Sequence, residues 1–173
     1  MDKIYLVKPS KDMKHRAIEF KQEFFTHGEQ TINGSSMWDH TDDYDKWLET
    51  VTKNANKETV NPSTVVSDVF FAVRESDDKI IGMIDLRHEL NEFLKDFGHS
   101  GYSVRPLERK KGFATEMLRQ VLVVAKQVGL KQVQLSCEKD NVPSVKTIEK
   151  NGGIYERSFQ YRGMPADVFI VVL

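Results

Sequence analysis

The stretch Val104–Leu118, V-R-P-L-E-R-K-K-G-F-A-T-E-M-L, combines a change from strand to helix with a local concentration of positive charge. Pro106 lacks an N–H group and ends the preceding strand, because a strand needs that donor for its ladder. Three basic residues at 109–111 then stand directly before Gly112. The first N–H groups of a helix have no partner within the helix and carry partial positive charge. The stretch therefore predicts an anion site, and phosphate suits such a site best.

Small side chains strengthen this interpretation. Gly112 and Ala114 have little or no side chain, so an anion can approach the backbone closely. The pattern suits a pyrophosphate, although the spacing alone also fits a charged surface turn before a core helix. The sequence contains neither G-x-x-x-x-G-K-[ST] nor G-x-G-x-x-G, so neither a P-loop nor a Rossmann fingerprint is predicted.

Composition limits the class of protein. The chain has 173 residues, 25 basic and 26 acidic side chains and a formal net charge of -1. A nucleic-acid-binding protein usually carries a basic excess, so no nucleic-acid partner is expected and the charge at 109–111 points to a local ligand. The length predicts one domain over residues 1–173. The five histidines have no spacing typical of metal ligands, so no metal is expected.

The expected location is the cytoplasm. The single cysteine, Cys137, cannot form an internal disulfide, which fits a reducing compartment. No run approaches the ~20 apolar residues of a membrane helix, so no membrane partner is expected. The N-terminal residues contain no apolar core of signal-peptide length.

Periodicity predicts an α+β fold with the order β, α, α, β, β, β, α, β, α, β, β. The most regular helix is expected at 112–128, where apolar residues recur every three or four positions and Gly129 ends the pattern. Strands followed by inserted helices are typical of a mixed, largely antiparallel sheet. The remaining helices are expected at 13–25, from 42 or 43 to about 51, and at 141–150, and the strands at 4–7, 68–74, 79–88, 99–104, 133–137, 154–160 and 168–172.

Two motifs carry a resemblance to a known family. Arg109–Ala114, R-K-K-G-F-A, matches the [Q/R]-x-x-G-x-[G/A] signature of the GNAT family of N-acetyltransferases, which the chain therefore resembles. Asn141–Ser144, N-V-P-S, followed by E-K-N-G-G at 149–153, is similar to that family's N-x-x-S…E-K-x-G-F. The segments 86–91 and 98–106 look like a bacterial subgroup of predicted acetyltransferases. Two motifs on the expected elements leave little room for the surface-turn interpretation.

The resemblance implies a GNAT fold, with a central, mostly antiparallel sheet of about seven strands that splays in the middle and about four flanking helices. It also implies acetyl-CoA as co-substrate and an amine as acceptor. The pyrophosphate would lie against the loop and first helical turn at 109–115. The residues that the resemblance assigns to the cofactor are Tyr102, Ser103, Val104, Arg109, Lys110, Lys111, Gly112, Phe113, Ala114, Thr115, Asn141 and Ser144. For Asn141, simple capping of the next helix is compatible with this role.

The reaction implied is direct acetyl transfer to an amine, which needs a base for the amine and a proton donor for the departing thiolate. Relatives often supply that donor from a tyrosine seven residues after the motif asparagine, but here the position holds Ile148. Ser144 is the catalytic candidate for this role, with three tyrosines, Tyr102, Tyr155 and Tyr161, as further candidates. Glu89, His88 and His99 are the candidates for the base, and for His99 a structural bond to backbone is the competing interpretation.

Several alternatives stay open at the level of sequence. Ile148 leaves room for a non-catalytic acyl-CoA-binding or sensor module, and a longer acyl chain could replace acetyl. Cys137 alternates with apolar residues, which favours a buried structural thiol over an acetyl carrier. Trp38, Tyr44 and Trp47 are expected to divide between core and acceptor pocket. Homodimers are common in the family, so the chain is expected to be either a monomer or a homodimer.

Overall fold

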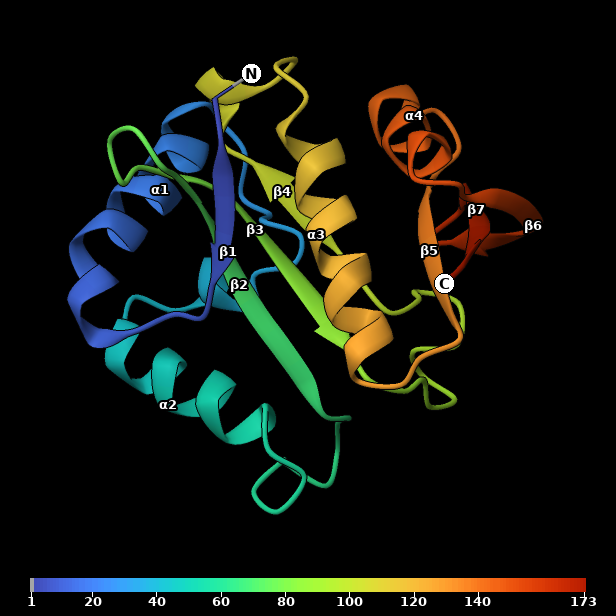
Figure 1. Cartoon of the computed structure of the whole chain (residues 1–173), viewed down its shortest axis with the longest axis horizontal. Helices are drawn as coiled ribbons and strands as arrows, with labels where there is room; N and C mark the ends of the chain where they lie inside the picture. The colour runs from blue at the N-terminus through green and yellow to red at the C-terminus, as the bar shows by residue number, and fades with distance from the viewer. Residues whose placement is uncertain (1) are drawn as a thin grey trace.

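The computed structural model describes residues 2–173, and these form seven strands and four α-helices in two antiparallel sheets (Figure 1). The first sheet has the order β1-β2-β3-β4, and the second has the order β5-β7-β6. The strands are β1 Ile4–Val7, β2 Ser67–Arg74, β3 Ile80–Arg87, β4 Tyr102–Val104, β5 Gln132–Glu138, β6 Ile154–Tyr161 and β7 Met164–Val172. The helices are α1 Lys14–Thr26, α2 Tyr44–Asn54, α3 Phe113–Gln127 and α4 Val142–Lys150, with short 3-10 turns at Lys11–Met13, Trp38–His40 and Pro106–Glu108.

The first sheet is buried on both faces, which explains the nearly continuous apolar runs of β2 and β3. Along β2, Phe70 and Ala72 pack in a cluster with α3, whereas Phe71 and Val73 pack in a second cluster with α1 and α2. Side chains of a strand alternate between its two faces, so one apolar strand supplies both cores. In Figure 1, α3 crosses in front of this sheet, and α4 lies with the second sheet.

The three aromatic residues of the α2 region belong entirely to the second core. Trp38, Tyr44 and Trp47 have exposed fractions of 1%, 0% and 3%. Their ring centroids lie 5.3 to 5.4 Å apart, a separation typical of favourable aromatic pairs. The expectation that part of this group lines an acceptor pocket is therefore wrong.

The two sheets meet at one place and then separate. Gly98 forms an isolated bridge with Leu135 of β5. Next to it, the N–H of His99 donates to the Gln134 carbonyl at 2.8 Å, and the N–H of Gln134 donates to His99 Nδ1 at 3.0 Å. Beyond this point β4 pairs only with β3, and β5 pairs only with β7. The sheet is thus splayed between β4 and β5.

The strand predicted at 99–104 is shorter in the structure, because its first three residues leave the ladder. The carbonyl of His99 accepts from Arg87 of β3, while its N–H bonds to β5. The N–H of Gly101 donates to the carboxylate of Asp85 at 2.6 Å instead of to a backbone carbonyl. Regular pairing therefore starts only at Tyr102. No helix among residues 2–173 is long and apolar enough to cross a membrane.

Candidate active site

The loop before α3 forms a concave row of backbone N–H groups. Lys110 and Gly112 have φ angles of 63° and 87°, both in the left-handed region. Left-handed residues alternating with right-handed ones turn successive N–H groups toward one point, which makes an anion-binding nest. Within the described chain, the N–H groups of residues 110–115 donate to no protein acceptor, and the first helical hydrogen bond runs from Glu116 to the Gly112 carbonyl.

The positive charges around this cradle are largely neutralised by neighbouring carboxylates. Arg109 forms a two-bond pair with Glu29, at 2.7 and 2.8 Å, and its Nε donates to the carbonyl of Val104. Lys111 donates to the buried carboxylate of Glu108 at 2.7 Å. Lys110 has no ion pair among residues 2–173. The unpartnered amides, more than the side-chain charges, are therefore the groups of this loop that are free to bind an anion.

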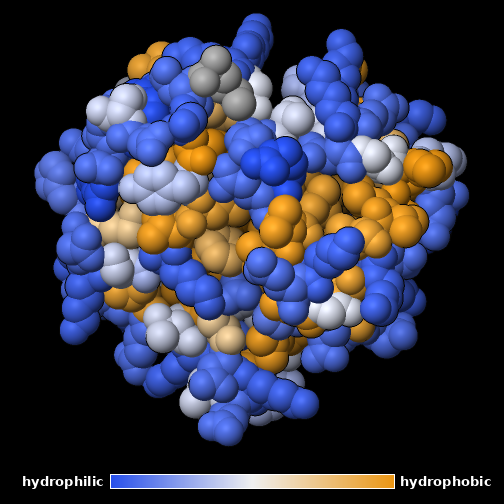
Figure 2. Space-filling view, viewed as in Figure 1, coloured by the Kyte–Doolittle hydropathy of each residue, from blue (hydrophilic) through white to orange (hydrophobic). Residues whose placement is uncertain are grey.

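The backbone edge of β4 that faces the splay pairs with no strand, and of its groups the Val104 carbonyl is held by Arg109 Nε. Gly82 pairs with Val104 and Ile84 with Tyr102, while Arg105 donates to Ile81 across the same ladder. In an antiparallel ladder every second residue bonds to the neighbouring strand, so the backbone groups of Tyr102 and Val104 point away from β3. They face β5, which does not pair with β4. In Figure 2 the outline of the molecule has a notch above this region. The segment before α3 lies on one side of the notch, and α4 lies on the other.

A small polar cluster lies across the splay. The hydroxyl of Tyr102 lies 2.8 Å from Ser144 Oγ on α4. Burial raises the pKa of Tyr102 to about 12, so its phenol keeps its proton near neutral pH. Cys137 of β5 lies beside Ser144, and burial raises the pKa of its thiol as well. Ile148, which stands at the position of the common tyrosine, is 1% exposed and packs in the core.

The other candidate tyrosines lie elsewhere. Tyr155 is 55% exposed and bonds Ser158 within β6, and Tyr161 is 38% exposed and stacks edge-on against Phe97. Of the three tyrosines considered for the proton donor, Tyr102 is thus the one whose hydroxyl reaches α4.

Helix α4 is held at both ends. Asn141 caps its start by accepting a hydrogen bond from the Ser144 N–H at 3.2 Å. At the other end, the Asn151 side chain donates to the carbonyl of Thr115 on α3 at 3.1 Å. These bonds place Ser144 opposite Tyr102. The remaining candidates for the cofactor lie along the same path: Phe113 has its side chain in the core, whereas Ser103, Ala114 and Thr115 are partly exposed.

The three candidates for the base have different surroundings. Nε2 of His88 lies 2.8 Å from the Asp68 carboxylate. Ring atom Nδ1 of His99 accepts the Gln134 N–H, and burial lowers the pKa of this imidazole. One ring nitrogen is therefore committed to joining the sheets. Glu89 is exposed in the bend after β3. Their assignment as bases stays a prediction.

The loop that contains Gly34 packs against the backbone of Gly101 and β3. A Cβ atom on Gly34 would overlap the carbonyl of Gly101, so the two backbones touch. Asp85, 4% exposed, bonds the Gly101 N–H and pairs with Arg87 at 3.1 Å, and burial raises the pKa of its carboxyl. Sequence reasoning did not identify Glu29, Gly34 or Asp85, because each reaches the site through contacts distant in sequence. An acidic residue within an apolar strand was the one available signal for Asp85.

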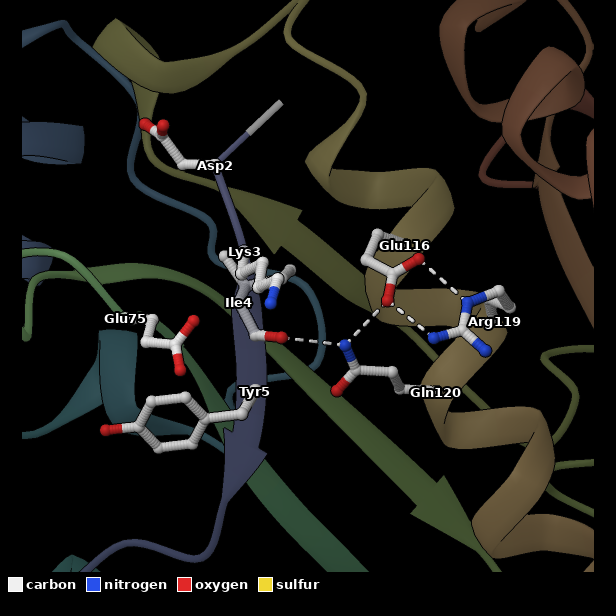
Figure 3. Close-up of a pocket in the computed structure, with 8 residues that line it drawn as sticks. All are labelled: Asp2, Lys3, Ile4, Tyr5, Glu75, Glu116, Arg119 and Gln120. Atoms are coloured by element: carbon white, nitrogen blue, oxygen red, sulfur yellow. Dashed lines mark hydrogen bonds and ion pairs between the residues drawn. The ribbon is translucent and has the colours of Figure 1, made fainter.

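Two shallow hollows lie outside the splay. One of about 340 Å³ is bordered by β1 and α3, where Gln120 donates to the Ile4 carbonyl at 2.9 Å (Figure 3). Gln120 also accepts from the Leu6 N–H. The other, of about 510 Å³, is lined by α1 and the segment after β4. Neither contains a residue of β5 or α4. Among residues 2–173, no group of three His, Cys, Asp or Glu side chains could hold a metal ion.

The profile described as an acetyltransferase (GNAT) domain matches residues 6–154. The chain belongs to the GNAT family of acetyltransferases. Both motifs, at 109–114 and 141–153, lie within the matched residues. No curated protein sequence matches the chain.

Solved structures support the GNAT fold over the whole chain. A predicted ribosomal-protein-serine acetyltransferase from Vibrio cholerae is 15% identical, with a TM-score of 0.69 over 100% of this chain and 95% of the other. A ribosomal L7/L12 α-N-protein acetyltransferase is 11% identical, with a TM-score of 0.71 over 98% and 94% of the two chains, and is in complex with coenzyme A through a disulfide. A predicted acetyltransferase from Salmonella typhimurium, with its cofactor acetyl-CoA, is 13% identical, with a TM-score of 0.65 over 98% and 93%.

Proposed function

We propose that this GNAT protein transfers the acetyl group of acetyl-CoA directly to a primary amine. The observation that carries the proposal is the row of unpartnered N–H groups at 110–115, which continues into the open edge of β4. A pyrophosphate satisfies the first set of donors, and the amides of a pantetheine arm satisfy the second. Acetyl-CoA carries both groups in that order.

The site also supports a direction for the bound co-substrate. The pyrophosphate lies at the N-terminus of α3, and the arm runs back along Val104 and Tyr102. Its sulfur then comes to lie near the hydroxyls of Tyr102 and Ser144, which are 2.8 Å apart. A strand rises by about 3.3 Å per residue, so the splay-facing backbone groups of Val104 and Tyr102, two residues apart, are separated by about 6.6 Å along the arm.

The transfer forms one bond and breaks another. The amine nitrogen attacks the thioester carbon, the C–N bond forms, and the C–S bond breaks. The amine gives up a proton to a base, and the sulfur leaves as a thiolate. The exposed Glu89 is a candidate for this base, whereas His99 could take the proton only after its Nδ1 releases the Gln134 N–H. Ser144 donates a hydrogen bond to that sulfur and passes it a proton, and the Tyr102 hydroxyl, 2.8 Å away, returns a proton to the serine and is itself reprotonated from water. The products are an amide and the free thiol of CoA.

Ile148 favours a second candidate function, that of a non-catalytic acyl-CoA-binding or sensor module. Its side chain lies in the core and offers no proton. The Tyr102–Ser144 pair argues against this alternative, because it supplies a hydroxyl where the tyrosine is missing. A broad panel of amines distinguishes the two. Thiol release with at least one amine supports the enzyme, and tight acetyl-CoA binding with no release supports the module.

Gly112→Glu tests the cofactor site. It places bulk and negative charge where the phosphate must lie, so we expect acetyl-CoA binding to be lost in calorimetry. The matched control is Gly129→Glu, because Gly129 is also left-handed, with φ of 94°, and lies at the other end of α3 with open space around it. Equal affinity in the two folded variants would rule out the cradle as the phosphate site.

Ser144→Ala tests the proton donor once an accepting amine is found. We expect kcat to fall by about 100-fold, a typical contribution of a positioned acid, while the dissociation constant for acetyl-CoA changes little. Tyr102→Phe is expected to have a smaller effect, and the double variant should be no slower than Ser144→Ala, because the tyrosine acts through the serine. Fully additive losses would contradict this arrangement.

A further inference from the structure

Ser100 lies at the end of the splay where β4 and β5 begin to separate, between a residue that bonds to β5 and a residue that bonds to β3. The residue before it, His99, donates its N–H to β5, and the residue after it, Gly101, exchanges hydrogen bonds with Asp85 of β3. Ser100 itself pairs with neither strand, although it is only 4% exposed. Its N–H donates to no protein acceptor among residues 2–173. The residue is therefore buried at the point where β4 and β5 separate.

The hydroxyl of Ser100 has no partner either. Two buried side-chain oxygens lack a hydrogen bond among the described residues, Asp68 Oδ1 and Ser100 Oγ. The aspartate oxygen lies 2.7 Å from the Lys8 ammonium and is thereby compensated. Ser100 Oγ has no such compensation. A buried hydroxyl without a partner destabilises a fold, so its presence calls for a ligand or another reason to be retained.

The hydrogen-bond acceptors around Ser100 already bind other donors. The carbonyl of Gly98 accepts from Arg87 Nη1 at 2.9 Å, and the carbonyl of His99 accepts from the Arg87 N–H. The two oxygens of Asp85 bond Gly101 and Arg87. The Ser100 hydroxyl and N–H are therefore two adjacent donors that no neighbouring protein group satisfies. Such a pair suits an oxygen atom that gains negative charge.

The register of β4 indicates which oxygen this is. Backbone groups of Tyr102 and Val104 face the splay, and those of Ser100 are the next to do so in the direction away from the phosphate cradle. If the thioester sulfur lies beside Tyr102 and Ser144, the acyl group lies beyond it, at Ser100. The oxygen of that acyl group gains charge when the amine attacks the carbon.

We propose that Ser100 is a further catalytic residue, whose hydroxyl donates a hydrogen bond to the carbonyl oxygen of the acetyl thioester. This role rests on the proposed function, since it requires acetyl-CoA in the splay. The hydroxyl stabilises negative charge on the oxygen while the C–N bond forms, as preorganised donors do in other acyl-transfer sites. It transfers no proton, and the hydrogen bond weakens again when the C–S bond breaks and the carbonyl returns.

A binding comparison tests this without any knowledge of the acceptor. CoA lacks the acyl oxygen, so the ratio of the dissociation constants for CoA and acetyl-CoA reports contacts to the acetyl group. We expect Ser100→Ala to lower this ratio by about threefold to tenfold, the worth of a typical hydrogen bond, with the constant for CoA unchanged. Ser100→Cys, which keeps the shape of the side chain with a slightly larger atom and is a weak donor, should behave in the same way.

Infrared spectroscopy gives a direct readout of the bond. The carbonyl stretch of [1-13C]acetyl-CoA should shift to lower frequency on binding to the unchanged protein, and this shift should become smaller with Ser100→Ala, which removes the hydroxyl and keeps the N–H. Stability should move in the opposite sense. Removing an unpartnered hydroxyl should leave the Tm of the ligand-free variant unchanged or raise it by about 2–4 °C.

Ser67→Ala is the matched control, because Ser67 is a buried serine at the start of β2, away from the splay. It should change neither the ratio nor the carbonyl frequency. An equal ratio and an equal frequency in Ser100→Ala and the unchanged protein would overturn the role of Ser100 while leaving the cofactor site intact. Failure of the unchanged protein to bind either CoA or acetyl-CoA would instead overturn the proposed function, and the role of Ser100 with it.

Discussion

The imidazole of His99 accepts a hydrogen bond that a backbone carbonyl would accept in a regular sheet. Its Nδ1 takes the N–H of Gln134, while the His99 N–H donates to the carbonyl of the same residue. A ring nitrogen that accepts such a bond carries no proton, so this arrangement requires neutral histidine. Burial, the largest cause, and the nearby Arg87 guanidinium lower the pKa of His99 further. The junction between the two sheets thus depends on the protonation of one side chain.

A pH dependence of stability follows from this residue. The folded chain binds the proton of His99 at a lower pH than the unfolded chain, whose ordinary pKa is 6.5. Between these two values the unfolded state holds more protons, so this contribution to stability is complete above pH 6.5 and is lost as the pH falls. The limiting slope is about 1.4 kcal/mol per pH unit. Urea unfolding at a series of pH values below neutrality measures it.

His99→Asn provides the comparison. The asparagine oxygen can accept the same N–H but does not titrate, so the variant should lose less stability than the unchanged protein as the pH falls below 6.5. If the free energy of unfolding fell equally in the two proteins below pH 6.5, groups other than His99 would be responsible for the loss of stability at acidic pH.

At the scale of elements, α1 and the segment that follows it are fastened to the connection between β4 and α3 by two ion pairs, one from each. Glu23 accepts from Arg105 and from the N–H of Leu107, and this pair is nearly buried. Glu29 forms the two-bond pair with Arg109, whose hydrogen bonds are the main cause of the lowered pKa of that carboxyl. Arg109 also holds the Val104 carbonyl. The guanidinium that the motif places beside the pyrophosphate therefore positions the loop.

Arg109→Gln and Glu29→Gln distinguish this positioning role from direct phosphate binding. If the pair holds the cradle in shape, each change should weaken acetyl-CoA binding by about twofold to fivefold, the worth of a half-exposed ion pair, and the double variant should be no weaker. Calorimetry measures the constants, with Lys126→Gln at the far end of α3 as the control for loss of charge. A large loss in Arg109→Gln with none in Glu29→Gln would show that the arginine binds the phosphate itself.

Elements with local signals were predicted well, and the departures have physical causes. The apolar stripe at 112–128 predicted α3 to within one residue at each end, because its periodicity and Gly129 lie within the segment. The strand predicted at 99–104 was too long, because His99 and Gly101 bond to β5 and to a side chain, which no alternation pattern reveals. The cradle was likewise local and predictable. Glu29 was not, since 80 residues separate it from Arg109.

At the scale of the whole molecule, the two sheets touch at one end of a wedge that stays open at the other. The contact consists of the Gly98–Leu135 bridge and the His99–Gln134 bonds. Further along, α4 reaches across to α3 through Asn151, and to β4 through Ser144 and Tyr102. A ligand in the splay would contact both sheets and therefore stabilise their relative arrangement.

Acetyl-CoA should consequently protect specific backbone amides from hydrogen exchange. We expect slower exchange at Tyr102, Val104 and residues 110–115, with little change in the β2–β3 ladder. The melting temperature should rise with ligand, by the equivalent of about 2.7 kcal/mol at a hundredfold excess over Kd. Exchange measured by mass spectrometry with and without ligand tests the pattern, and protection confined to the hollow beside β1 would contradict the proposed site.

The outer edge of β1 stays uncovered during synthesis until Gln120 has been made. Its amide meets the Ile4 carbonyl and the Leu6 N–H, so a side chain of α3 covers the edge that another strand could otherwise join (Figure 3). More than a hundred residues separate the two partners. While the nascent chain emerges from the ribosome, β1 to β3 are complete long before Gln120 arrives. The early sheet thus passes through a period in which its edge is unprotected, and the growing chain is then most vulnerable to aggregation and most suited to capture by a chaperone.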